Sequence, residues 1–155
     1  MKKLFLALAT TLSLPNMSYA AACPTGTDAA PTAGCTISTS DITYTLTGGI
    51  TTTGTAADGL YLLSSNNNTT TLNGGISTTG NVAFGLTLFN SNNNTTTLTG
   101  DISTTGNAAY GLTLFGSNNN TTTLTGGIST GNVGGTSGSD AYGLYLLNST
   151  NNTTN

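Results

Sequence analysis

Apolar residues return at a fixed interval along the chain and, within each interval, at every second position. A glycine that precedes a pair of apolar residues stands at equal steps at Gly59, Gly85 and Gly111, and again at Gly143 after a longer step. The period, roughly 26 residues, is typical of a solenoid or another repeat array. The apolar positions that recur in successive copies are expected to form stacked core columns. They are Leu60, Leu86, Leu112 and Leu144; Leu62, Leu88, Leu114 and Leu146; and Ile50, Ile76, Ile102 and Ile128.

The spacing of two residues within one copy is a strand period and not a helical one. Each copy therefore fits three short strands, around GLTLF, TTTLTG and DISTTG, with Gly and Asn clusters at the corners. We expect an all-β fold, a right-handed parallel β-helix (solenoid) of about four to five coils, each of roughly 26 residues. Each strand would pair with its counterpart one coil away, at about 4.8 Å. A four-bladed β-propeller or a sandwich could also be built from short Thr-rich strands, although the period is short for a four-stranded blade.

The segment SNNNTTTLTG stands at residues 91–100 and is repeated, with small changes, at 65–74 and 117–126. Its asparagines Asn66, Asn92 and Asn118 share one column at a corner, where stacked amides can hydrogen-bond along the axis. Asparagine also tolerates the left-handed backbone conformation that a sharp corner favours. In the strand that follows, alternation points every second threonine outward. The resulting candidate surface-binding array consists of Thr43 and Thr45, Thr69 and Thr71, Thr95 and Thr97, and Thr121 and Thr123.

The amino-terminal segment, residues 1–22, has the parts of a secretory signal peptide and its cleavage region. Two lysines precede a short apolar run at residues 4–14, and small residues follow, so that cleavage after Ala20 or after Ala22 fits the pattern. The run is shorter than the roughly 20 residues of a membrane-spanning helix. We expect export to the cell surface, the outer membrane or the medium. Residues 23–34 would cap the repeats and residues 35–155 would form them.

Cys23 and Cys35 are the two cysteines of the chain. An even number of cysteines in an exported chain favours a disulfide, which we expect between them. With so few cysteines and no histidine, a zinc site is not expected.

Charge narrows the function classes further. Without the two lysines of the leader, the side chains comprise five aspartates and no cation, which argues against nucleic acid and anionic membranes as partners. A nucleophile-and-base site needs His, Lys or paired carboxylates, and the aspartates are scattered. We expect no enzyme activity, no cofactor and no small-molecule substrate.

The sequence ISTTGNAAYGL at residues 102–112 recurs at 76–86 and, with a longer insertion, at 128–144. It resembles repeats in the passenger regions of bacterial autotransporters and related surface adhesins, over about residues 35–155. The resemblance implies a secreted β-helical stalk or adhesin that contacts a host or cell surface or associates with itself. It also implies an outer-membrane translocator as a partner if the chain is a fragment, since the family's carboxyl-terminal barrel is not in this sequence. No functional residues carry over from the resemblance.

Two other interpretations of the same residues stay open. The threonine array, uncharged and carrying both hydroxyl and methyl groups, is suited to ordered water and so to an ice-binding protein. Exposed strand edges and low charge are typical of a functional-amyloid-like surface structure.

Overall fold

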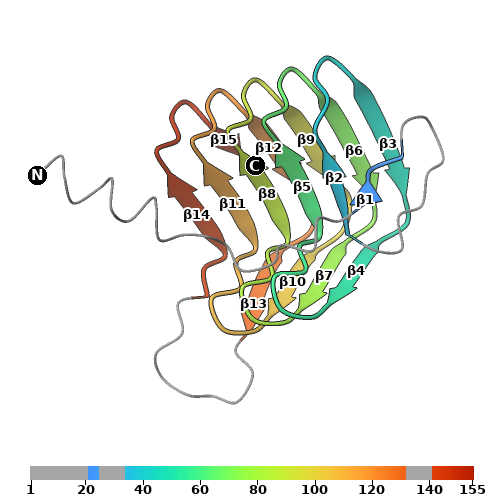
Figure 1. The fold of residues 1–155 in the computed structure, drawn as a ribbon, viewed down its shortest axis with the longest axis vertical. Helices are drawn as coiled ribbons and strands as arrows, with labels where there is room; N and C mark the ends of the chain where they lie inside the picture. The colour runs from blue at the N-terminus through green and yellow to red at the C-terminus, as the bar shows by residue number, and fades with distance from the viewer. Residues whose placement is uncertain (1–20, 25–33, 132–140) are drawn as a thin grey trace, which may run out of the picture.

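The computed structural model describes residues 21–24, 34–131 and 141–155, so most of the predicted leader at 1–22 and most of the predicted cap at 23–34 lie outside the described residues. Every regular element of the described part is a β-strand. The strands form three parallel sheets that are wound into a β-solenoid (Figure 1). The predicted all-β parallel solenoid with 26-residue coils is therefore confirmed.

Each sheet collects one strand from every coil. The first sheet contains β1 (Ala21–Ala22), β2 (Cys35–Ile37), β5 (Leu60–Leu63), β8 (Leu86–Phe89), β11 (Leu112–Phe115) and β14 (Leu144–Leu147). The second contains β3 (Thr43–Thr47), β6 (Thr69–Asn73), β9 (Thr95–Leu98), β12 (Thr121–Leu124) and β15 (Thr153–Thr154). The third contains β4 (Ile50–Thr53), β7 (Ile76–Thr79), β10 (Ile102–Thr105) and β13 (Ile128–Gly131).

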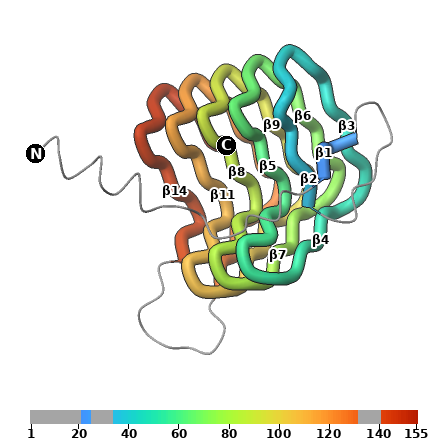
Figure 2. The backbone as a smooth tube through the Cα atoms, viewed as in Figure 1, coloured from blue at the N-terminus to red at the C-terminus, as the bar shows by residue number. Residues whose placement is uncertain are grey.

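Successive coils stack with the same residue of each copy opposite its counterpart (Figure 2). Leu112 pairs with Leu86 on one side and with Leu144 on the other, although the second step along the chain is longer than the first. The six extra residues of the last copy fall between β13 and β14 and leave the pairing of these strands unchanged. The register thus follows the apolar columns, because a slip by one residue would turn every inward side chain to solvent.

The core runs along the axis of the solenoid. Leu60, Leu86 and Leu112 and the isoleucines Ile50, Ile76 and Ile102 are at most 1% exposed. Burial of such side chains contributes about 25 cal/mol for each Å² of apolar surface removed from water. Thr70, Thr96 and Thr122 also point inward, and their hydroxyls have no hydrogen-bond partner.

The two ends of the described stack differ. At the amino-terminal end Cys23, Cys35, Ile37 and Tyr44 are buried in the core cluster, and β1 pairs with β2. At the other end Leu144 and Leu146 are in register but are 44% and 45% exposed. These two residues were predicted as core, and they pair as expected, but no described residue covers their outer side.

Glycine precedes the first-sheet strands β2, β5, β8 and β11 for a steric reason. A Cβ atom on Gly85 would lie 2.4 Å from Ile102 Cγ2 and 2.6 Å from the carbonyl oxygen of Gly111. Contacts this short do not occur in folded proteins without a shift of the neighbouring backbone. The glycine spacing that reveals the repeat in the sequence is therefore a packing requirement of the coil.

Candidate functional site

The described residues contain no group of three or more His, Cys, Asp or Glu side chains that could hold a metal ion. No helix in this part of the chain is long and apolar enough to span a membrane. The features with potential for function are the three outer faces of the solenoid, one on each sheet.

The outer face of the second sheet, here named the threonine face, carries the predicted array. Thr69 pairs with Thr43 and Thr95, and Thr95 with Thr121, which gives one row of threonines along the axis. A parallel row contains Thr45, Thr71, Thr97 and Thr123. All of these residues are exposed or half-buried. The structure therefore brings together all eight residues of the predicted array on one face.

The outer face of the third sheet is also hydroxyl-rich but is less regular. One row contains Thr51 followed by serines, and the other contains threonines and ends at Gly131. Neither face has a charged side chain in its two rows, and the strand spacing is the same in both. The third sheet differs because each serine lacks the methyl group of a threonine. It is a natural control for the threonine face.

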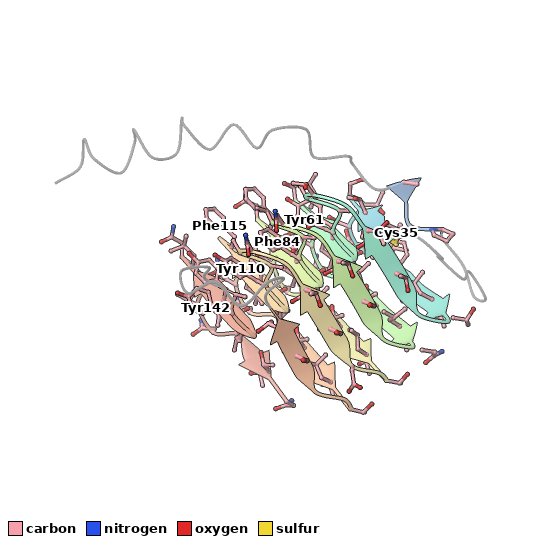
Figure 3. All side chains as sticks on the ribbon, turned by 90° about the horizontal axis from the view of Figure 1, so that it is seen from below. Cys35, Tyr61, Phe84, Tyr110, Phe115 and Tyr142 are labelled. Carbon is pink, nitrogen blue, oxygen red and sulfur yellow. A yellow bond between two sulfur atoms is a disulfide. The ribbon has the colours of Figure 1, made fainter. Side chains whose placement is uncertain are left out.

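The outer face of the first sheet is aromatic, which the sequence reasoning did not predict. Phe84 stacks on Tyr110 with ring centroids 5.1 Å apart, and Phe89 stacks on Phe115 at 5.0 Å. Figure 3 shows Phe84, Tyr110 and Tyr142 following one another along the solenoid. The signal was present in the sequence as aromatic residues just before Gly85, Gly111 and Gly143. The stacking explains why this column repeats.

Asp58 begins that aromatic column, one coil before Phe84. Burial raises the pKa of the Asp58 carboxyl to about 6, although the hydrogen bond that Oδ1 accepts from the Phe84 N–H lowers it. This hydrogen bond is 2.9 Å long. The carboxyl links two coils, and the column continues with aromatic residues and not with further carboxyls.

The corner asparagines form the predicted ladder. Asn92 Oδ1 accepts the backbone N–H of Asn118 at 2.8 Å, and Asn92 in turn donates its N–H to Asn66 Oδ1. The left-handed conformation, however, belongs to the next asparagine along the chain, such as Asn93 with φ 57°. Ladder and turn are thus assigned to different residues.

A third asparagine in each copy forms a second ladder that the sequence reasoning missed. Asn94 Oδ1 accepts the N–H of Asn68, and Asn120 Oδ1 accepts the N–H of Asn94. Asn94 Nδ2 also donates to the carbonyl oxygen of Ser65, 3.0 Å away. Because Asn94 is 1% exposed, its amide replaces the water that these backbone groups would otherwise need.

Cys23 and Cys35 form a disulfide, with a Cα–Cα distance of 4.8 Å. Both residues are buried, at 5% and 2% exposure. The disulfide joins the segment after β1 to β2, at the amino-terminal end of the described solenoid.

Comparisons with known protein families, with curated protein sequences and with solved structures find no match to this chain. The fold and the outer faces are therefore the basis for any statement about function.

Proposed function

We propose that this protein is an exported, non-catalytic β-solenoid of the cell surface, similar in role to the passenger stalk or adhesin region of an autotransporter. The observation that carries the proposal is that many hydrogen-bonding groups of one coil bond to the coils next to it. The backbone, the serine hydroxyls and the amides of two asparagine columns are all used in this way. Such a stack supplies length and outer faces with few charged side chains, which are the properties of a stalk.

Two features support export. The first is the leader pattern of residues 1–22, with its positive, apolar and small-residue parts. The second is the Cys23–Cys35 disulfide, because disulfides persist mainly in oxidising compartments. Together they favour a location outside the cytoplasm, at the cell surface, in the outer membrane or in the medium.

The partners proposed for such a stalk are surfaces and not small molecules. A host or cell surface, a second copy of the chain, and an outer-membrane translocator fit the proposal. Nucleic acid does not fit, because residues 21–155 contain no Lys or Arg to contact phosphate.

The experiment is to locate the protein in its own cells. An antibody raised against the folded chain is applied to intact cells, and the same cells are fractionated. The proposal expects labelling of intact cells and loss of the label after brief external protease treatment. A strain without the gene is the control for antibody specificity. The settling rate of this strain, compared with that of the parent strain, measures the contribution of the protein to cell–cell association.

A protein that stays in the cytoplasmic fraction with reduced cysteines would contradict the proposal. A soluble periplasmic protein that the antibody reaches only after the outer membrane is opened would contradict it equally. Surface labelling with unchanged adhesion and settling would assign the chain to the stalk and not to the adhesin.

A further inference from the structure

The threonine face differs from the other two outer faces in its regularity. Its paired rows hold threonine at every position from Thr43 to Thr121 and from Thr45 to Thr123. Neighbouring positions are about 4.8 Å apart between coils and about 6.7 Å apart along a strand. The face is therefore a two-dimensional lattice of hydroxyl and methyl groups, with both spacings set by the backbone and not by flexible side chains.

The hydroxyls of this lattice are available to a ligand. In the described part of the chain, none of the eight outward threonines has a hydrogen bond from its hydroxyl to another residue. The inward threonines Thr70, Thr96 and Thr122 are buried and cannot reach the surface. The outward hydroxyls are therefore solvated, and water bound to one of them has a neighbour at the same site one coil away.

The side chains also restrict what the ligand can be. β-Branched threonine has few χ1 rotamers, so the groups of the lattice lose little freedom when a surface binds them. No charged residue stands in either row, and an isolated polar molecule would contact only a small part of the array. A repeating surface with oxygen atoms at regular intervals would contact all of it.

We propose that the threonine face binds ice, by ordering water in register with its two rows of threonines. Hydroxyl groups anchor the water molecules, and the methyl groups between them favour an ordered arrangement of the first layer. This inference does not depend on the stalk proposal, since a solenoid can bind ice whether it is attached to a cell or free. The face is short, about 15 Å from the first coil to the fourth, and we therefore expect a weak effect.

The test uses the full chain, oxidised and folded, and measures ice recrystallisation and the shape of a growing ice crystal at micromolar protein concentration. The proposal expects slowed recrystallisation and faceted crystals. Thr97→Lys places a charge at the centre of the lattice and should abolish the effect. The matched control is Thr79→Lys, which puts the same charge on the exposed outer face of β7 in the third sheet and should retain it.

Thermal melting of both variants establishes that they are folded. A further variant does not depend on a disruptive substitution: it duplicates residues 91–116 to add one coil and lengthen the lattice. The added coil should increase the effect at equal molar concentration. Inactive wild-type protein, equal loss in both lysine variants, or no gain from the added coil would each overturn the proposal. Binding to crystalline polysaccharide without any effect on ice would overturn it as well.

Discussion

Removing the buried amide of Asn94 is expected to destabilise the solenoid far more than changing either of the two asparagines before it. In the triplet at 92–94, Asn94 accepts the Asn68 N–H at 2.9 Å and donates to the Ser65 carbonyl at 3.0 Å. Asn94→Ala leaves both backbone groups without their partner in a site that is 1% exposed. Each orphaned buried group costs about 1–3 kcal/mol, so the loss for the two groups is about 2–6 kcal/mol.

The neighbouring asparagines provide matched controls of the same composition. Asn92→Ala removes the acceptor of the Asn118 N–H at a half-buried corner, where water can replace the amide, and should cost about 1 kcal/mol. Asn93 has φ 57° and is exposed, so Asn93→Gly should change stability by only a few tenths of a kcal/mol.

The assay is urea unfolding at neutral pH, followed by circular dichroism with the disulfide intact. A loss of about 2–6 kcal/mol is a large part of the roughly 5–15 kcal/mol by which a typical domain is stable, so the urea midpoint of Asn94→Ala should fall clearly. The reasoning is refuted if Asn94→Ala and Asn92→Ala have the same midpoint, or if Asn93→Gly is the most destabilised of the three.

Three further predictions follow from the glycine packing, the disulfide and the buried Asp58 carboxyl. Gly85→Ala should cost about 3 kcal/mol or more because its Cβ meets backbone and core atoms, whereas Gly127→Ala, with no atom within 4 Å, should be neutral in the same unfolding assay. Joint replacement of Cys23 and Cys35 by serine should lower stability by about 3 kcal/mol; a melting temperature unchanged by the replacement would contradict a stabilising role of the disulfide. Burial raises the pKa of Asp58 to about 6, so the folded chain keeps a proton that the unfolded chain loses near pH 4. The stability that this protonated form contributes is complete below pH 4 and is lost as the pH rises through 6, on the order of 3 kcal/mol in all. Asp58→Asn should remove that pH dependence from a series of unfolding midpoints.

The sequence was sufficient to predict the architecture because the repeat constrains it strongly. The predicted strands around GLTLF, TTTLTG and DISTTG correspond to β8, β9 and β10, and the outward direction of Thr69 and Thr71 is as expected from the inward Leu72. In a stack of identical coils each column must bury or expose the same residue type. The column pattern therefore reports the face of each side chain directly.

Features that depend on contacts between neighbouring columns could not be predicted in the same way. The three asparagines at 92–94 have the same side chain. The path of the corner alone decides that Asn93 is exposed and left-handed and that Asn94 is buried. The aromatic stacks depend on ring orientation, which a column of Phe84 and Tyr110 does not define. The short strand β1 lies outside the repeated sequence, and it pairs with β2 next to the Cys23–Cys35 disulfide.

The most direct test of the coil register is a cross-link between two positions that only this register brings together. Thr97 and Thr123 are paired neighbours on adjacent coils, with Cα atoms about 4.8 Å apart, a distance that a disulfide can span. The double variant Thr97→Cys, Thr123→Cys should form this disulfide in the folded protein, as mapped by peptide mass. In the control Thr97→Cys, Thr121→Cys, the second cysteine lies two residues before position 123 in β12, with its Cα about 8 Å from that of residue 97, and should not cross-link. Efficient cross-linking of the control pair, or none of the first pair in a folded chain, would contradict the solenoid described above.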